Sequence, residues 1–461
     1  MTYMTKLTCF KAYDIRGEVD VELTPGIAYR IGRAYASWLH PRRVVVGADI
    51  RLSSEALKAA LAEGLMSSGV NVIDIGLTGT EEIYFATREL RADGGIQITA
   101  SHNPAHDNGM KLVREEARPI SNDNGLLEIK ALAEKNVFPP AVHRGVLTAY
   151  DNRPAWIRCL LRFFRHPLIR PLRLVANSGH GTAGPALDAL AEALNHAGVP
   201  VEFIRLHHQP DGRFPAGVPN PMLAENQLAT RQAVIDNHAD FGIAWDGDFD
   251  RCFFFDQRGE FIESYYLVGL FARHFLQHSP GSSVILDPRL IWNTLEVIKR
   301  NGGKPIISKT GHAFIKARMR QEDAIYGGEM SGHHYFREFG YCDSGMIPLV
   351  LMLQIIGGSH QPLSDFIADA QAHFPVSGEI NRVVDDPAAI LKSITAYYQP
   401  QSPQYDDCDG VSLAFADWRF NLRASNTEPL LRLNVETRGD TGLLAAKTAE
   451  VLAFIATKEA L

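Results

Sequence analysis

Runs of β-branched residues alternate along this chain with segments in which apolar residues recur at helical spacing. Each run is long enough for one strand, and each helical segment follows its run after a brief polar stretch. Such alternation is typical of α/β units with largely parallel strands. The strand and helix pairs that we expect are Arg43–Gly47 with Ser53–Ser68, Leu172–Ala176 with a helix from Pro185, and Val284–Leu286 with Trp292–Arg300.

A second apolar strand in each of these units ends in a polar loop. In open α/β sheets, ligands bind beyond the carboxyl ends of the strands. Three related domains that each present one loop to a shared cleft would explain the pattern. We expect these strands at Gly95–Ile98, Phe241–Trp245 and Ala324–Tyr326, and the loops that follow them read TASHNP, DGDFDR and GEMSGH.

The C-terminal segment departs from this pattern. Strand-like residues at Gly410–Phe415 and Leu430–Val435 flank the loop RASNTEP, which indicates a smaller α+β domain. The sequence therefore predicts three related α/β domains with mixed, mostly parallel sheets, plus a smaller α+β C-terminal domain, around a central cleft. The domain boundaries that we expect are 1–150, 151–257, 258–371 and 372–461.

Composition narrows the class of protein. Apolar residues make up 46% of the chain and the formal net charge is −7, with no basic stripe, which argues against a nucleic-acid partner. The five cysteines are scattered without a CxxC pair, as in a reduced cytoplasmic protein. The longest apolar stretch, Met346–Ile356, is too short to cross a membrane, and the N-terminus lacks a signal-peptide pattern. We expect a cytoplasmic enzyme without a membrane partner.

The DGDFDR loop places three carboxylates, Asp246, Asp248 and Asp250, within five residues. Such crowding favours a hard divalent cation. An EF-hand is excluded because its sixth and twelfth positions would be Arg251 and Gln257. The sequence predicts a Mg²⁺ site completed by a phosphate oxygen, and the alternative is an acidic surface turn.

Ser101 lies in the TASHNP turn, directly after an apolar strand. A serine needs a base, a metal or prior modification to react, and no G-x-S-x-G elbow is present. We expect His102, its neighbour in sequence, to point away from the Ser101 hydroxyl. A phosphorylated Ser101 beside the aspartate loop is one interpretation, and a turn or helix-capping serine is the other.

Two further loops carry polar groups suited to a phosphorylated sugar. GEMSGH offers a carboxylate, a hydroxyl and an imidazole, and RASNTEP offers a guanidinium with hydroxyl and amide donors. Either loop could equally be a solvated turn. The glycines at 179, 181 and 184 outline a dinucleotide fingerprint, but the next strand, Val201–Leu206, ends without the expected acid. A glycine-rich turn is the better interpretation there.

Taken in order, these loops resemble the α-D-phosphohexomutase family over essentially the whole chain. KAYDIRG at Lys11–Gly17, Met330 and Asn426 are similar to its phosphomannomutase/phosphoglucomutase branch. The resemblance implies a phosphoserine enzyme that interconverts mannose 6-phosphate and mannose 1-phosphate through a hexose 1,6-bisphosphate, and that feeds GDP-mannose synthesis. It also implies Mg²⁺ as cofactor and a hexose 1,6-bisphosphate as activator. The alternatives are a dual-specificity phosphoglucomutase, and a phosphosugar phosphatase or binding protein.

The resemblance also assigns roles to individual residues. Arg289 stands where some relatives carry lysine, and His106 begins a variant of the usual D-Y-N-G motif, so substrate contacts can differ in detail. The oligomeric state that we expect is a monomer or a homodimer. The implied catalytic residues are Ser101, Lys111, Arg251, His312 and His333; the implied substrate-binding residues are Tyr13, Arg16, Arg289, Glu329, Ser331, His333, Arg423, Ser425, Asn426 and Thr427; and the implied magnesium ligands are Ser101, Asp246, Asp248 and Asp250.

Overall fold

The computed structural model describes residues 6–425 and 430–459. The chain divides into two compact units, each assembled from two segments. The first unit comprises Met1–Phe261 and Glu338–Pro362, and the second comprises Ile262–Arg337 and Leu363–Leu461. None of the described helices is both long enough and apolar enough to cross a lipid bilayer.

The first unit begins with a mixed sheet in the order β1-β5-β4-β2-β3-β7, with β6 paired to β5. β2 pairs in parallel with β3 and β4, whereas β5 runs antiparallel to β4 and β1. The strands are β1 (Ile15–Glu18), β2 (Arg43–Ala48), β3 (Asn71–Leu77), β4 (Gly94–Ile98), β5 (Asp107–Arg114), β6 (Arg118–Pro119) and β7 (Leu147–Ala149), and the helices are α1 (Pro25–Leu39), α2 (Ser54–Ser67), α3 (Thr80–Glu89) and α4 (Leu126–Lys135).

A second sheet of the first unit has the order β11-β10-β8-β9. β10 is parallel to β8 and antiparallel to β11, so the loop between β10 and β11 is a tight reversal at the carboxyl end of β10. The elements are α5 (Arg153–Leu161), β8 (Leu172–Asn177), α6 (Ala183–His196), β9 (Val201–Leu206), α7 (Ala224–Asp236), β10 (Phe241–Trp245) and β11 (Cys252–Phe255). β12 (Phe261–Ile262) leads into the second unit, and β17 (Cys342–Asp343) and α11 (Met346–Gly357) complete the first.

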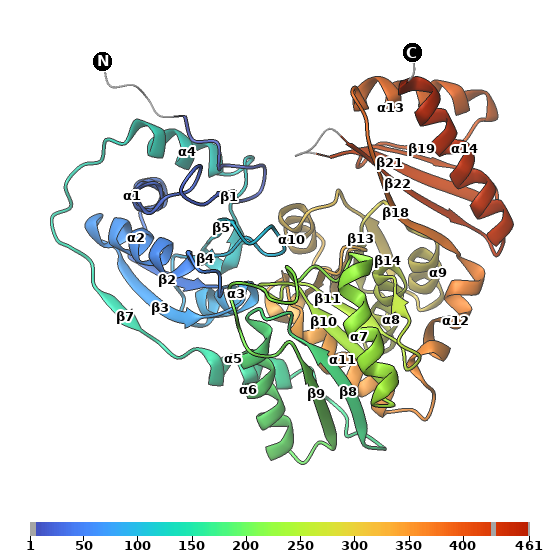
Figure 1. Ribbon diagram of the computed structural model, residues 1–461, viewed down its shortest axis with the longest axis horizontal. Helices are drawn as coiled ribbons and strands as arrows, with labels where there is room; N and C mark the ends of the chain where they lie inside the picture. Colours follow the sequence, from blue (N-terminus) through green and yellow to red (C-terminus); the bar gives the residue numbers. More distant parts are fainter. Residues whose placement is uncertain (1–5, 426–429, 460–461) are drawn as a thin grey trace. The chain divides into compact units, whose positions relative to one another are not determined.

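The second unit contains a sheet in the order β14-β13-β15-β16, followed along the chain by an antiparallel sheet in the order β18-β22-β21-β20-β19. Helices α13 and α14 pack against the antiparallel sheet (Figure 1). The elements are α8 (Ser264–His278), β13 (Ser283–Leu286), α9 (Trp292–Arg300), β14 (Lys304–Ile307), α10 (His312–Gln321), β15 (Tyr326–Gly328), β16 (His334–Phe336), α12 (Leu363–His373), β18 (Val376–Val383), α13 (Pro387–Tyr398), β19 (Gln404–Asp406), β20 (Val411–Ala414), β21 (Trp418–Ala424), β22 (Leu430–Thr437) and α14 (Thr441–Glu459).

Most of the predicted strands form where the sequence placed them, but the strand expected at Ala324–Tyr326 is wrong by two residues. The observed strand, β15, begins at Tyr326 and runs through Gly327 and Gly328. Neighbouring side chains occupy the space that Cβ atoms at these glycines would fill; at Gly328 the Val268 side chain would lie 2.6 Å away. Glycine, which usually weakens a strand, is accepted there because a helix side chain packs directly onto the backbone. The four domain boundaries stay predictions.

Candidate active site

Ser101 lies directly beyond β4, in a buried turn of the first unit. Its backbone φ is 50°, in the left-handed region that few residues other than glycine adopt. The hydroxyl Oγ donates a hydrogen bond to Asp246 Oδ2 at 2.6 Å, although the two residues are 145 positions apart in sequence. A strained, buried serine held against a carboxylate from another sheet is an arrangement that a surface turn does not need.

Asp246, Asp248 and Asp250 follow β10, and all three are almost fully buried. One carboxylate oxygen from each lies within 4.8 Å of the others. Among the described residues, Asp248 Oδ1 has no hydrogen-bond partner. Buried carboxylate oxygens that converge, one of them unsatisfied, form the donor set that a hard divalent cation prefers, so these residues fit Mg²⁺.

Lys111, on β5, neutralises part of this charge. Its Nζ lies 2.7 Å from Asp248 Oδ2 and also forms an ion pair with Asp250. Burial opposes the charge on Lys111, but the two carboxylates outweigh it and raise the pKa of Lys111. Thr80, the first residue of α3, donates its hydroxyl to Asp248 Oδ2 at 2.5 Å. The aspartate loop is therefore tied to the first sheet through two of its carboxylates.

Arg251 joins Asp246 to the serine turn. Its Nε and Nη2 donate to Asp246 Oδ2 at 3.0 and 2.8 Å, and Nη2 reaches Ser101 Oγ at 3.5 Å. The prediction that His102 points away from the serine hydroxyl is wrong, because His102 Nδ1 lies 3.1 Å from Ser101 Oγ and also accepts from Arg251. The left-handed φ of Ser101 turns the two neighbouring side chains to the same side. Burial, together with Arg251, lowers the pKa of His102 well below its usual value.

The residues from the KAYDIRG motif support the same turn. Arg16, on β1, donates through Nη1 to Asn103 Oδ1 at 2.8 Å and to the carbonyl of Ala100, and its Nε pairs with Asp14. Tyr13 lies half-buried in the bend before β1. The structure therefore brings Arg16 to the backbone of the serine turn.

Sequence reasoning missed Arg51, which holds more of the serine turn than any other described side chain. Its Nη2 donates to the carbonyls of Ser101 and Asn103 at 2.9 and 2.7 Å, and its Nη1 donates to those of Pro104 and Asp107 at 2.6 and 2.9 Å. Arg51 is nearly fully buried and is fixed by Asp49, whose Oδ2 lies 3.4 Å from Nε. The fragment ADIRLSS, directly after a predicted strand, was the available signal.

Gly247 lets the aspartate loop approach the serine turn. A Cβ at Gly247 would lie 2.5 Å from the carbonyl oxygen of Ser101, so any larger residue would push the two loops apart. The glycine-rich turn at 179–184 also contacts Gly247, because Thr182 Oγ1 donates to the Gly247 carbonyl at 3.1 Å and a Cβ at Gly181 would lie 2.7 Å from the same oxygen. That turn therefore packs against the aspartate loop.

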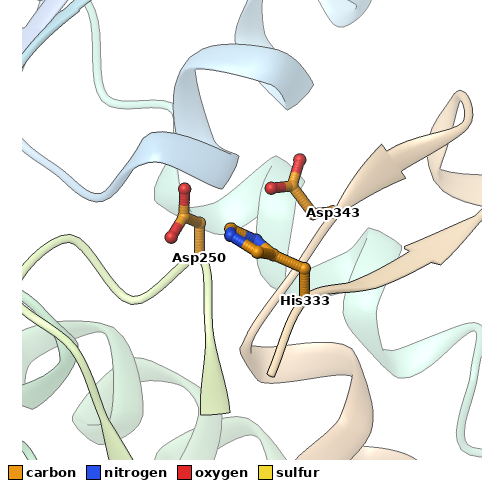
Figure 2. Close-up of side chains that lie close together, drawn as sticks. All are labelled: Asp250, His333 and Asp343. Carbon is orange, nitrogen blue, oxygen red and sulfur yellow. The ribbon is translucent and has the colours of Figure 1, made fainter. Parts of the chain in front are cut away.

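Two further buried acids were also missed. Figure 2 shows Asp343, at the end of β17, close to Asp250, and a carboxylate oxygen of each lies within 4.8 Å of the other. Glu81, on α3, accepts from the backbone N–H groups of Gly345 and Met346 at 2.7 and 3.1 Å and so caps α11. Burial raises the pKa of Glu81 to about 8. His333, also labelled in Figure 2, belongs to the second unit and is described with it.

In the second unit, Arg289 is the centre of an ion-pair cluster. It lies in the loop after β13 and pairs with Asp287 through Nη2 at 2.8 Å. The carboxylates of Glu329 and Glu379 lie 3.7 and 3.6 Å from its guanidinium. Glu329 is also fixed by the Gly311 N–H at 3.0 Å and the Tyr335 hydroxyl at 2.5 Å. These carboxylates outweigh the effect of burial and raise the pKa of Arg289.

The remaining predicted residues of the second unit lie in three separate segments of the chain. His312 is the first residue of α10, and Ser331 and His333 lie half-buried between β15 and β16. The His333 ring stacks on Tyr335, with centroids 6.0 Å apart. Arg423, at the end of β21, pairs with Glu379 at 3.2 Å, and Ser425 N donates to the Leu430 carbonyl at 2.9 Å. The predictions for Asn426 and Thr427 fall outside the described residues.

Comparison with known proteins places this arrangement in a family. Residues 7–139, 158–259 and 263–374 match the phosphoglucomutase/phosphomannomutase alpha/beta/alpha domains I, II and III, and residues 379–453 match its C-terminal domain. The chain belongs to the phosphoglucomutase/phosphomannomutase family. The family and the fold class expected from the sequence are therefore confirmed. The assignment of individual site residues stays a prediction.

Individual relatives agree with this family. A phosphomannomutase of Escherichia coli is 57% identical over 455 residues, which cover 98% of this chain and all of the relative. The crystal structure of a phosphoglucomutase/phosphomannomutase family protein from Burkholderia thailandensis is 29% identical, with a TM-score of 0.89 and 98% coverage of both chains. Aspergillus fumigatus N-acetylphosphoglucosamine mutase, solved in complex with GlcNAc-6P and magnesium, shares the fold at 12% identity and a TM-score of 0.59, covering 99% of this chain and 97% of its own.

Proposed function

We propose that this chain is a phosphomannomutase, an isomerase that interconverts mannose 6-phosphate and mannose 1-phosphate. The observation that carries the proposal is the buried hydroxyl of Ser101, which lies 2.6 Å from Asp246 within a cluster of three aspartates. Full-length bacterial relatives at 54–57% identity are phosphomannomutases, which favours this activity over the alternatives. A phosphatase or a binding protein would not require a serine so enclosed.

In the proposed reaction Ser101 carries the phosphoryl group. The Ser101 Oγ–phosphorus bond breaks as a sugar hydroxyl oxygen bonds to phosphorus, and the reverse transfer from the other end of the hexose 1,6-bisphosphate restores the phosphoserine. Arg251 reaches Ser101 Oγ and supplies positive charge where the phosphoryl group lies. His312 and His333 stay the predicted candidates to exchange the proton of the sugar hydroxyl.

The aspartates would hold the cation that a phosphoserine requires. Asp246, Asp248 and Asp250 have the oxygen ligands, the burial and the unsatisfied Asp248 Oδ1 that suit Mg²⁺. When bound, Mg²⁺ would neutralise the charge of the phosphoryl group. Lys111, which pairs with two of the aspartates, would then be available to the phosphate oxygens. The solved A. fumigatus relatives in complex with magnesium and with glucose 1,6-bisphosphate support both the cofactor and the activator.

In the second unit, Glu329 and Arg423 would bind the rest of the substrate. Glu329 is a fixed, buried carboxylate, suited to accept hydrogen bonds from two neighbouring sugar hydroxyls. Arg289 and Arg423, with Ser425, would hold the phosphate that does not react. Supply of mannose 1-phosphate for GDP-mannose, a cytoplasmic location and a monomeric or homodimeric state stay predictions.

The test compares substrates and products in one assay. We expect kcat/KM for mannose 1-phosphate to exceed that for glucose 1-phosphate, with inorganic phosphate released at a negligible fraction of the turnover rate. Ser101→Ala should abolish turnover while the melting temperature stays close to that of the wild type. Phosphate release that keeps pace with sugar turnover would overturn the mutase assignment in favour of a phosphatase.

A further inference from the structure

Two arginines face each other on neighbouring strands of the C-terminal sheet. Arg423 on β21 and Arg432 on β22 are direct partners in the antiparallel register. Like charges directly opposite one another destabilise a sheet. Both side chains are largely withdrawn from solvent, with 12% and 29% of their surface exposed, so water screens the repulsion only in part. The pair therefore needs a counter-ion.

Glu379, on the next strand β18, supplies that charge. Its Oε2 lies 3.2 Å from Arg423 Nη2, and its Oε1 lies 3.5 Å from Arg432 Nη1. The register of β18 against β22 shifts between Val376 and Glu379, an irregularity that can redirect a side chain. Among the described residues, neither arginine forms an ion pair with another carboxylate.

The same carboxylate reaches the neighbouring domain of the unit. Glu379 Oε2 also lies 3.6 Å from Arg289 Nη1, and Arg289 is held in addition by Asp287 and Glu329. Burial raises the pKa of Glu379, but the three guanidinium groups outweigh it and keep that pKa below its usual range. The cluster thus contains three guanidinium groups and three carboxylates and is close to neutral, which is unusual for a site expected to bind a phosphate dianion.

We propose that Glu379 is a resident counter-ion of the phosphate site and competes with the substrate's phosphate for Arg289, Arg423 and Arg432. The proposal rests on the proposed function, in which Arg289 and Arg423 hold the non-reacting phosphate. The consequence is that this site binds the phosphate weakly. A bisphosphate that must present first one phosphate and then the other to Ser101 has to leave this site during each cycle, and an internal competitor allows that release.

The experiment measures phosphate binding directly, apart from turnover. The full chain is titrated by calorimetry with inorganic phosphate and with mannose 6-phosphate, as wild type, Glu379→Gln and Arg423→Met. Removing one negative charge about 6 Å from a bound phosphate dianion, at an effective dielectric constant of about 40, is expected to tighten binding about 100-fold in Glu379→Gln. The matched control is Glu322→Gln, which removes a carboxylate from the Arg318 ion pair on α10 and should leave both affinities unchanged.

The outcomes distinguish failure of the proposed phosphate site from failure of the role proposed for Glu379. If Arg423→Met binds phosphate as tightly as wild type, the proposed phosphate site itself is wrong. If Arg423→Met loses binding but a folded Glu379→Gln binds no more tightly than wild type, Glu379 does not compete with the phosphate and the inference is overturned. Should Glu379→Gln fold poorly, Glu379→Asp withdraws the charge by one methylene, and binding that is tighter by about threefold is expected.

Discussion

Replacement of Arg51 by lysine tests whether the serine turn must be held rigidly for phosphoryl transfer. The guanidinium donates to four carbonyls of the turn, from two nitrogens at fixed separation. Lysine keeps the charge opposite Asp49, but its donors radiate from a single nitrogen. We expect about two of the four hydrogen bonds to be lost. Each hydrogen bond from a charged donor contributes about 1.5–3 kcal/mol, so the loss of two removes about 3–6 kcal/mol of the interaction free energy that fixes the turn.

Part of this lost interaction free energy should appear as a lower rate of phosphoryl transfer. A displacement of Ser101 by a fraction of an ångström is expected to reduce kcat about 100-fold, because transfer requires aligned reacting atoms. KM should change by less than about threefold, since the groups proposed to bind substrate lie elsewhere. The assay is coupled mannose 1-phosphate turnover, with thermal melting to check the fold. A kcat within threefold of wild type would refute the positioning role of Arg51, and a matching rise in KM would assign Arg51 to substrate binding.

Three further predictions concern the metal, the close contact of the loops and the pH dependence of stability. Asp248→Asn should weaken Mg²⁺ binding, measured by calorimetry, about 100-fold and abolish turnover; unchanged affinity would remove Asp248 from the ligand set. Gly247→Ala should lower both kcat and the melting temperature, since its Cβ would meet the Ser101 carbonyl at 2.5 Å, and wild-type kinetics would show that the loops can separate freely. Burial lowers the pKa of His334 to about 3, so its stabilising contribution is present above the unfolded pKa near 6.5 and is lost as pH falls. In urea titrations between pH 4 and 6, the free energy of unfolding of His334→Asn should therefore fall with acid less steeply than that of the wild type, by about 1.4 kcal/mol per pH unit. An equal slope in the two proteins would contradict a buried neutral imidazole.

The sequence was informative where chemistry is local. Three aspartates within five residues, after a buried strand, identify a charged loop independently of the rest of the sequence. The strand β10 and this loop form where the pattern predicts them. Ser101 could be located for the same reason, because an apolar strand leads into its turn. The environment of the Ser101 side chain could not be predicted, because the left-handed φ that brings His102 beside the hydroxyl is set by contacts with Arg51 and the aspartate loop.

The missed residues all act through distant partners. Arg51 lies 50 positions from Ser101, and the fragment ADIRLSS does not indicate which carbonyl groups its guanidinium binds. Glu379 meets Arg423 and Arg432 only because β18, β22 and β21 are adjacent and the register of β18 shifts. Strand order and register are properties of the assembled sheet, so single-sequence patterns do not specify which buried charges pair.

We propose that Ser101 is a rechargeable phosphoryl carrier. The most direct measurement is to incubate the dephosphorylated full chain with Mg²⁺ and glucose 1,6-bisphosphate and to locate the added phosphoryl group by peptide mass spectrometry. One phosphoryl group is expected on Ser101, acquired as hexose monophosphate appears and passed on again when excess mannose 1-phosphate is added. Phosphate on another residue, or a Ser101 that stays unmodified while mannose phosphates interconvert at the full rate, would contradict it.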